Sequence, residues 1–283
     1  MPLTTTKKML EDAQRGGYAV GAFNAENMEM MQAIIEAAVE MRAPVMIQTT
    51  PSTVCYASLE LFYANVSVLG GSAPVPVALH LDHGDSHELA VRAIGAGYTS
   101  VMIDGSKEGF EENIRLTSGV VAAAREKGIP VEAEIGTLGG KEDGLVNEEG
   151  GYTDPSQAAE FTARTGVQSL AVAIGTAHGI YHGTPKLDIE RLKRIRLEVE
   201  IPLVLHGASG LADADIRACI AEGICKVNFA TELRIAYSEG VKAVLKETPD
   251  VFDPKKYSAA GRKRVKQLVV DRIGVCGCSY RAG

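Results

Sequence analysis

Eight short, β-rich apolar runs recur along the chain, and segments with helical spacing separate them. This alternation is typical of repeated βα units around a parallel sheet. The runs cover residues 18–23, 44–48, 75–81, 99–103, 131–135, 169–174, 202–205 and 224–227. Eight strands in 283 residues favour a closed (β/α)8 barrel over an open doubly wound sheet. We therefore expect one α/β domain over residues 1–283.

Local signals support helices between the runs. Apolar positions from Phe110 to Ala124 follow helical spacing, and Gly128 is placed to end that helix. Asp154 precedes a proline and a glutamine, the arrangement of a capped helix start. The segment that begins at Asp253 predicts an extra C-terminal helix.

Composition excludes several classes of function. A net charge of −7 without a basic run argues against nucleic-acid and anionic-membrane partners. The sequence shows neither an apolar run of membrane-spanning length nor the pattern of a secretory leader, so we expect a cytoplasmic protein. Five cysteines, an odd number at irregular spacing, predict reduced thiols.

Polar and titratable residues follow the apolar runs repeatedly. In a barrel of this kind, the carboxyl ends of the strands and the loops after them carry the chemistry. The residues at these ends are Asn24, Thr49, Thr50, Asp82, His83, Asp104, Ser106, Glu134, His178, His206 and Asn228. We therefore expect the functional site at this end of the barrel.

Three histidines at these ends predict a metal site. His83, His178 and His206 follow the third, sixth and seventh runs, and each precedes a glycine. A barrel would bring their rings together, and three imidazoles leave an open position on zinc for a substrate oxygen. Each histidine taken alone is better explained as a hydrogen-bonded loop residue. That structural interpretation is the one we favour for His80, His87 and His182.

Carboxylates flank the histidines. Asp82 directly precedes His83, which places a base beside the metal. Glu134 ends the fifth run, and a glycine-rich, charged loop over 139–144 follows it, typical of a mobile lid. Glu142 and Asp143 in this loop are explained equally well as solvated charges.

Phosphate sites in such barrels are built after strands seven and eight from backbone amides and helix N-termini. The loop from His206 to Gly210 contains two glycines and Ser209. The loop from Asn228 to Thr231 opens a helical segment. An anionic substrate would be bound by these local groups.

Six motifs in order resemble the class II ketose-bisphosphate aldolases. They are His80-Leu81-Asp82-His83-Gly84, Val101-Met102-Ile103-Asp104-Gly105-Ser106, Glu132-Ala133-Glu134-Ile135-Gly136 with Gly139-Gly140-Lys141-Glu142-Asp143, Ala173-Ile174-Gly175-Thr176-Ala177-His178-Gly179, Leu205-His206-Gly207-Ala208-Ser209-Gly210 and Lys226-Val227-Asn228-Phe229-Ala230-Thr231. Thr50-Pro51, the Gly175-Thr176-Ala177-His178 run and the Cys276-Gly277-Cys278 tail resemble the tagatose-bisphosphate branch, whereas Gly84 resembles fructose-bisphosphate members. The resemblance implies a TIM barrel that cleaves tagatose or fructose 1,6-bisphosphate into dihydroxyacetone phosphate and glyceraldehyde 3-phosphate.

The resemblance also implies roles for individual residues. Zinc would be bound by His83, His178 and His206, with Glu134 as an alternative ligand. Asp82 would exchange the proton of the C4 hydroxyl, and Glu142 the proton at C3. Substrate and phosphate contacts are implied at Asn24, Thr50, Gly179, Gly207, Ala208, Ser209, Asn228, Ala230 and Thr231. The family further implies a Na⁺ or K⁺ ion at the phosphate site, a homodimer or homotetramer, and in some members a helper subunit.

Three other interpretations stay open. A Schiff-base aldolase would need a buried lysine, and Lys226 is the one candidate on a strand. A noncatalytic partner subunit would have lost ligands or the base, whereas this sequence keeps them. An aldolase for another phosphorylated ketose or keto acid would differ in residues that the sequence does not identify.

Overall fold

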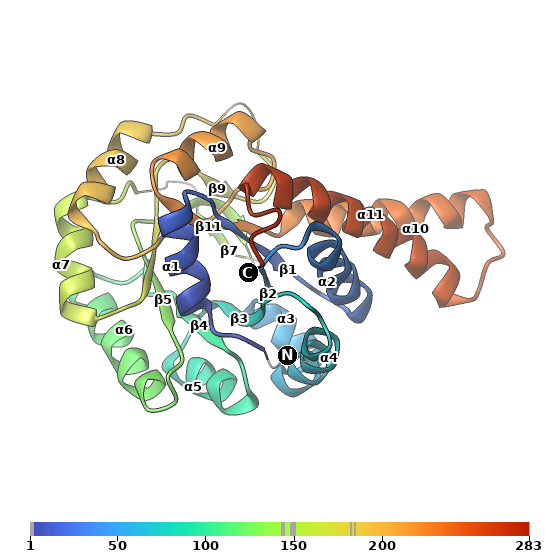
Figure 1. Ribbon diagram of the computed structural model, residues 1–283, viewed down its shortest axis with the longest axis horizontal. Helices are drawn as coiled ribbons and strands as arrows, with labels where there is room; N and C mark the ends of the chain where they lie inside the picture. Colours follow the sequence, from blue (N-terminus) through green and yellow to red (C-terminus); the bar gives the residue numbers. More distant parts are fainter. Residues whose placement is uncertain (1–2, 143–144, 148–150, 182, 184, 283) are drawn as a thin grey trace.

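A closed barrel of eight parallel strands forms the centre of the protein (Figure 1). The computed structural model describes residues 3–142, 145–147, 151–181, 183 and 185–282, with the backbone alone at 141–142 and 145–147. The barrel strands are β1 (Val20–Asn24), β2 (Val45–Thr49), β3 (Val77–Gly84), β4 (Ser100–Ile103), β5 (Val131–Ile135), β8 (Ser169–Val172), β10 (Leu203–Leu205) and β11 (Ile224–Phe229). The β1–β11 pairing closes the ring. The predicted (β/α)8 architecture is confirmed.

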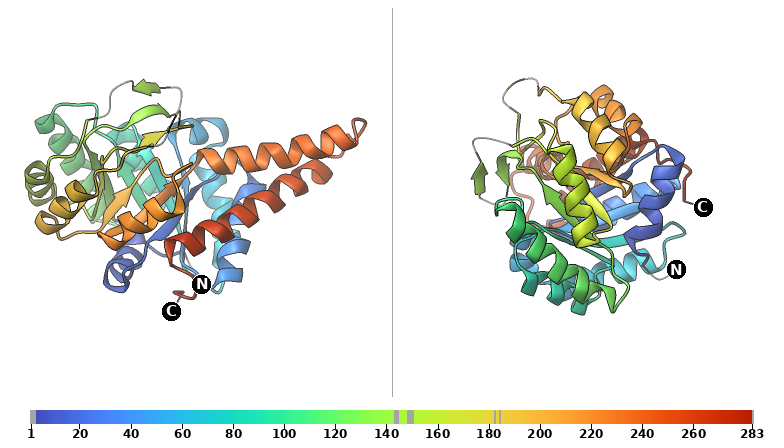
Figure 2. Two further views of the ribbon diagram at one scale, coloured as in Figure 1. Left: turned by 90° about the horizontal axis from the view of Figure 1, so that it is seen from above. Right: turned by 90° about the vertical axis from the view of Figure 1, so that its left-hand side faces the viewer.

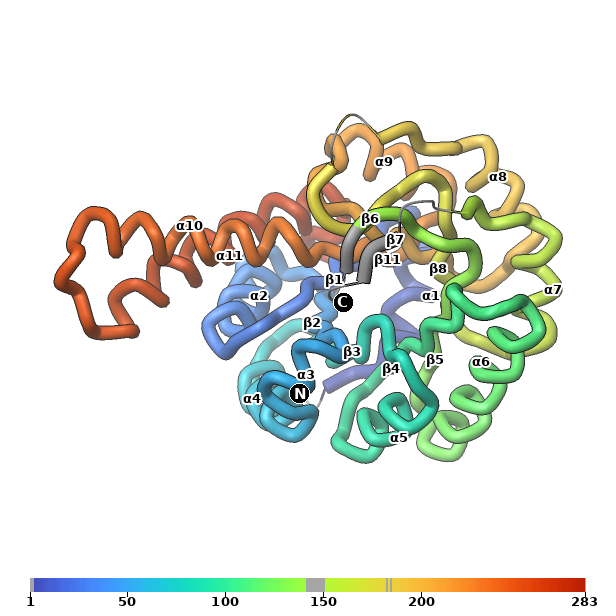
Figure 3. Tube along the Cα trace, turned by 180° about the vertical axis from the view of Figure 1, so that it is seen from behind, coloured from blue at the N-terminus to red at the C-terminus, as the bar shows by residue number. Residues whose placement is uncertain are grey.

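Helices surround the barrel, as Figure 3 shows from the opposite side. They are α1 (Thr6–Gly16), α2 (Met28–Met41), α3 (Pro51–Ala57), α4 (Leu59–Gly71), α5 (His87–Ala96), α6 (Phe110–Arg125), α7 (Pro155–Thr165), α8 (Ile189–Glu198), α9 (Asp213–Ala221), α10 (Thr231–Glu247) and α11 (Pro254–Cys276). The Asp154 carboxylate accepts hydrogen bonds from the backbone N–H groups of Ser156 and Gln157, as the capping signal predicts. Helix α6 ends at Arg125, and a turn leads from there to Gly128, so the helix stops earlier than the glycine suggested.

The predicted C-terminal helix is α11, and it packs along α10. The two helices form a hairpin that projects from the barrel (Figure 2). Helix α11 also packs against α2, which anchors the hairpin to the barrel wall. Of the helices in the described ranges, none is both long and apolar enough to span a bilayer.

A second, three-stranded sheet lies outside the barrel in the order β7-β6-β9. Its strands are β6 (Gly139–Glu142), β7 (Leu145–Asn147) and β9 (Ala177–His178). Strands β6 and β7 pair antiparallel, and β9 adds in parallel beside β6. Residues 139–142 of the segment expected to be a lid loop therefore form a strand. Its pairing with β9 was not foreseen, because a two-residue strand leaves no periodicity to read.

The cysteines of the chain are unpaired. Cys55 is exposed, whereas Cys219, Cys225, Cys276 and Cys278 are buried. Burial raises the pKa of the Cys225 thiol to about 11, because a thiolate would lose its hydration.

Candidate functional site

The carboxyl ends of the barrel strands bring the three predicted histidines together. The possible ligand atoms of His83, His178 and His206 all lie within 4.8 Å of one another. A second set, formed by His83, Asp104 and Glu134, meets the same limit. The ring centroids of His83 and His206 are 4.6 Å apart, and those of His83 and His178 are 5.0 Å apart. His83 lies at the end of β3 and His206 directly follows β10, whereas His178 comes from β9, outside the barrel.

His83 occupies a strained position at the end of β3. Its φ of 48° lies in the left-handed region that residues with a Cβ rarely adopt. The pairing of β3 with β4 shifts between Leu81 and Gly84, so the chain bulges where His83 sits. A Cβ at Gly84 would lie 2.4 Å from the carbonyl oxygen of Met102, so only glycine allows this approach. The bulge turns the His83 ring toward the other two histidines.

The second nitrogen of His83 is held by a carboxylate. Nδ1 lies 2.8 Å from Oδ2 of Asp104, and the other oxygen of that carboxylate, Oδ1, accepts the backbone N–H of Ser106. Burial would raise the pKa of Asp104, but the hydrogen bond and charge of His83 outweigh it and hold that pKa well below its usual range. Such a carboxylate partner fixes the tautomer of a metal-binding imidazole and leaves Nε2 as the ligand atom.

His178 reaches the site on β9, outside the barrel. The loop that carries it is tied to the loop after β10 by Tyr181, whose hydroxyl accepts from the N–H of Ala177 and donates to the carbonyl of Gly207. Gly207 has a φ of 68°, and a Cβ there would lie 2.5 Å from the Ala177 carbonyl oxygen. The close contact between these loops places His178 opposite His206.

His206 is fully buried between two glutamates of β5. Its Nδ1 lies 3.0 Å from Oε2 of Glu134, and its Nε2 lies 3.0 Å from Oε1 of Glu132. Burial lowers the pKa of His206, but the two carboxylates outweigh burial and raise it to about 9. A metal ion would have to displace the proton on Nδ1, as metal binding to imidazole generally does.

These groups fit a zinc ion. Three imidazoles are a common catalytic zinc set, and ligand atoms around tetrahedral zinc lie about 3.4 Å apart. Separations within 4.8 Å allow this geometry after small side-chain rotations. Glu134 lies 3.0 Å from His206 and 4.0 Å from His83, where it can serve as a further ligand.

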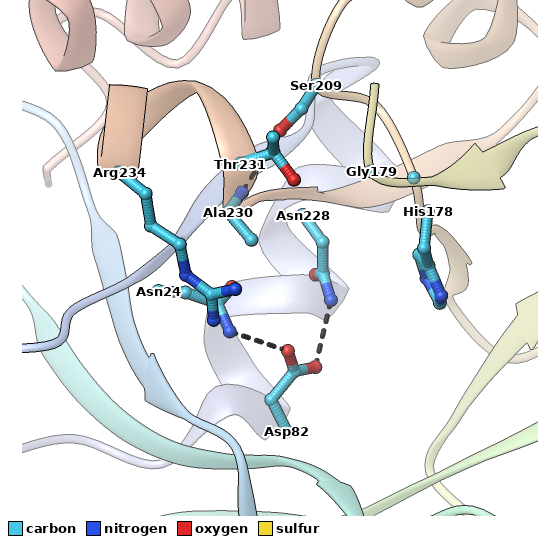
Figure 4. Close-up of a pocket in the computed structure, with 10 residues that line it drawn as sticks. Asn24, Asp82, His178, Gly179, Ser209, Asn228, Ala230, Thr231 and Arg234 are labelled. Carbon is cyan, nitrogen blue, oxygen red and sulfur yellow. Dashed lines mark hydrogen bonds between the residues drawn. The ribbon is translucent and has the colours of Figure 1, made fainter. Parts of the chain in front are cut away.

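Asp82 lies next to the histidines and forms one wall of a cavity (Figure 4). Its carboxylate accepts hydrogen bonds from Asn24 and Asn228, each at 2.9 Å, and from Gln48 at 3.2 Å. The amides belong to three neighbouring strands, β1, β2 and β11. Asp82 is almost completely buried, so these bonds fix the orientation of its carboxylate.

The other end of the cavity has the character of an anion site. Its lining includes Gly179, Gly207, Ser209, Ala230 and Thr231. The first turn of α10 begins at Thr231, so its unpaired N–H groups and positive dipole end face the cavity. The Ser209 hydroxyl accepts the N–H of Ala230 at 3.2 Å and joins the two predicted phosphate loops.

Two predicted contact residues are absent from the described lining of this cavity. Thr50 is buried at the start of α3, where its hydroxyl pairs with those of Ser52 and Thr53. Ala208 is buried in the hydrophobic core. The side chain of Glu142, together with Asp143, Gly144 and His182, lies outside the described residues.

Arg234 lines the cavity and was not identified from the sequence. It lies in the first turn of α10, and Glu26 accepts its Nε–H at 2.6 Å. A lysine or arginine on a surface helix carries no distinctive signal in a sequence. Gln48 was also missed, although a glutamine inside the otherwise apolar β2 could have indicated an inward-facing polar group.

Comparisons with known proteins agree with this geometry. Residues 4–281 match the family described as fructose-bisphosphate aldolase class-II. The YdjI aldolase of Escherichia coli K12 is 41% identical, with 99% of this chain and 100% of that chain covered and a TM-score of 0.88. A Coccidioides immitis protein, provisionally assigned as a fructose-1,6-biphosphate aldolase, is 33% identical over 97% of this chain and 96% of that chain, with a TM-score of 0.89.

The fold is shared more widely. The fructose-bisphosphate aldolase of Campylobacter jejuni is 22% identical, covers 99% of this chain and 97% of its own, and superposes with a TM-score of 0.82. From the match along nearly the whole sequence and the two relatives above 30% identity, we conclude that this chain belongs to the class II fructose-bisphosphate aldolase family, whose members are zinc-dependent aldehyde-lyases.

Proposed function

We propose that this chain reversibly cleaves a ketose 1,6-bisphosphate into dihydroxyacetone phosphate and glyceraldehyde 3-phosphate. The observation that carries the proposal is the arrangement of one cavity. Asp82 and His178 line its walls, and the amide-rich loops at Gly207 and Thr231 line its end. A base, a metal ligand and an anion site therefore face the same small volume.

The bond between C3 and C4 breaks in this reaction and leaves negative charge on C3. A zinc ion held by His83, His178 and His206, with Glu134 as an alternative ligand, would polarise the C2 carbonyl and stabilise that charge. Asp82 takes the proton of the C4 hydroxyl as the aldehyde forms. The three amides that hold the Asp82 carboxylate keep it oriented for this transfer.

Protonation of C3 completes cleavage, and we assign it to Glu142 on β6. The C1 phosphate is placed at Gly179, Gly207, Ser209, Asn228, Ala230 and Thr231. Backbone amides suit this task because they bind a phosphate dianion without the reorganisation that a flexible cation needs. Asn24, Thr50 and Ala208 remain proposed as contacts or supports of the same substrate.

The proposal includes assembly and ions. We propose a homodimer or homotetramer in the cytoplasm, a Na⁺ or K⁺ ion near the phosphate, and residues 1–283 acting as one domain, with or without a helper subunit. The projecting α10–α11 hairpin exposes Phe252 between its helices, which supports contact with another chain.

The Schiff-base interpretation loses its support in the structure. The Lys226 side chain is fully buried, and its Nζ donates to Glu132 at 2.9 Å. It is not part of the described cavity lining, and an amine held in this way is not available to attack a ketone.

Removal of the metal tests the proposed function. A chelator should abolish cleavage of tagatose and fructose 1,6-bisphosphates, and added zinc should restore it. Borohydride with substrate should leave the enzyme active, because no iminium forms. Activity that survives removal of zinc, or covalent trapping of substrate on Lys226, would refute the proposal.

A further inference from the structure

A layer of titratable residues lies inside the barrel directly below the site. His80, Glu132 and Lys226 are each no more than 1% exposed. Each stands two positions before a residue of the site, namely Asp82, Glu134 and Asn228. Side chains two positions apart in a strand point to the same side, so both layers face the barrel interior.

One oxygen atom joins this lower layer to a metal ligand. Oε1 of Glu132 accepts from Lys226 Nζ at 2.9 Å and lies 3.0 Å from Nε2 of His206. The other oxygen of Glu132 is 3.5 Å from the Ser169 hydroxyl and 3.9 Å from Nε2 of His80. The carboxylate of Glu132 is thus placed between Lys226 and His206 at hydrogen-bonding distance from both.

Lys226 supplies the positive charge that this carboxylate needs. Burial lowers the pKa of His80 to about 3, and the charge of Lys226 acts in the same direction, so His80 is neutral near pH 7. Lys226 is therefore the cation that pairs with the buried Glu132 carboxylate, with 2.9 Å between Nζ and Oε1. A buried carboxylate that lost this cation would be strongly destabilised.

We propose that Lys226 is a positioning residue for the metal site, which it organises through Glu132. Lys226 holds the Glu132 carboxylate in place, and Glu132 binds Nε2–H of His206 so that Nδ1 faces the metal. The inference rests on the proposed function, because it assumes that His206 binds zinc. It assigns to the lysine a task that involves no contact with the substrate.

The test compares zinc binding in four variants of the full-length chain. Lys226→Met keeps an unbranched side chain without the charge, and Glu132→Gln keeps an acceptor oxygen without the charge. The double variant leaves neither charge unpaired. Ser100→Ala is the matched control, because Ser100 is buried in the same region and bonds to His80 but not to Glu132. Zinc affinity is measured by competition with a chelator, and cobalt(II) replaces zinc for absorption spectra.

Lys226→Met should weaken zinc binding about 10- to 100-fold, the usual effect of losing a residue that orients a metal ligand. Its cobalt spectrum should differ from that of the unmodified protein, because His206 is no longer fixed. The double variant should bind zinc as Glu132→Gln does, since both changes break the same connection. Ser100→Ala should keep normal affinity and spectrum even if it unfolds at a lower temperature.

Two outcomes would overturn the inference. One is normal zinc affinity and an unchanged cobalt spectrum in Lys226→Met. The other is a double variant whose zinc affinity is lower than that of Glu132→Gln by the same factor by which Lys226→Met lowers the affinity of the unmodified protein. Lys226 would then act independently of Glu132. If Lys226→Met does not fold, the comparison of the double variant with Glu132→Gln decides. An unmodified protein that binds no zinc would instead contradict the proposed function.

Discussion

At the scale of single residues, two of the proposed metal ligands have an unusual backbone conformation or electrostatic environment. His83 adopts a left-handed conformation, and His206 is buried between two carboxylates. Such features cost stability and persist where the surrounding structure enforces them, which is frequent at functional sites. The sequence identified both histidines from their positions after apolar runs, but conformation and carboxylate contacts depend on tertiary packing.

His206→Ala should remove most of the bound zinc. Two imidazoles do not hold the ion in a site that must also keep a position open for the substrate. Zinc per chain is measured by atomic absorption after dialysis. His87→Ala is the control, because His87 is exposed on α5 and should leave the zinc content unchanged. A His206→Ala protein with full zinc content would show that His206 is not a ligand.

Asp82→Ala should keep zinc and lower turnover by about 10² to 10⁴, the range for a lost acid–base group. The change also leaves buried amide donors without their acceptor, which costs about 1–3 kcal/mol of stability. Turnover is therefore measured on protein whose folding is checked by circular dichroism. Asp85→Ala, on the exposed turn after β3, is the control. Unchanged turnover in Asp82→Ala would refute its role.

At the scale of elements, the barrel strands could be predicted because most are short, β-rich runs dominated by apolar residues, even where polar residues such as Glu132 and Lys226 interrupt them. The predicted run at 131–135 coincides with β5. Helix caps such as Asp154 were predictable for the same local reason. The small sheet was not, because β6 and β9 are brought together by the barrel and not by neighbouring sequence. Arg234 escaped notice because its contact with Glu26, 208 positions away in the sequence, forms only in the folded chain.

The charge on α10 yields a prediction about substrate binding. Arg234→Gln should raise KM for the bisphosphate about tenfold with little change in kcat, because a charge-assisted bond to an anion contributes about 1.5 kcal/mol in a partly exposed place. Steady-state kinetics measure both constants. Arg264→Gln removes an exposed arginine that pairs with Glu239 on the hairpin, and it should change neither. If the Arg234→Gln variant had the same KM as the unmodified protein, a contact between Arg234 and the bisphosphate would be excluded.

At the scale of the whole molecule, the barrel unites groups that lie far apart in sequence. Asp82 of β3 and Asn228 of β11 are separated by 146 positions, yet Nδ2 of Asn228 donates a hydrogen bond to Oδ1 of Asp82 at 2.9 Å. The order of strands around a closed barrel brings them together, so the composition of the site followed from the fold. The exact hydrogen bonds of the site could not be predicted, because the alternation of side chains along a strand shows only which side of the strand a residue faces.

The same arrangement affects the choice between tagatose and fructose 1,6-bisphosphate, which are epimers that differ only at C4. Thr49, at the end of β2, is not available to the substrate, because its hydroxyl shares a hydrogen bond of 2.8 Å with the Tyr98 hydroxyl. Next to Asp82, by contrast, the buried oxygens Oε1 of Gln48 and Oδ1 of Asn228 have no hydrogen-bond partner among the described residues. A C4 hydroxyl of the right configuration could use one of them. The wrong epimer would leave it unpaired.

We therefore predict that both epimers are cleaved, with a modest preference for tagatose 1,6-bisphosphate. One neutral hydrogen bond contributes about 1 kcal/mol, or about fivefold in rate, which is far from exclusive selection. The preference for tagatose follows the resemblance of Thr50-Pro51 and the Cys276-Gly277-Cys278 tail to that branch. Condensation of dihydroxyacetone phosphate with glyceraldehyde 3-phosphate, stopped before equilibration, gives the ratio of the two products. An early product that is almost wholly fructose 1,6-bisphosphate would contradict the preference and leave the aldolase assignment intact, because cleavage depends on the metal site and Asp82 and not on this contact.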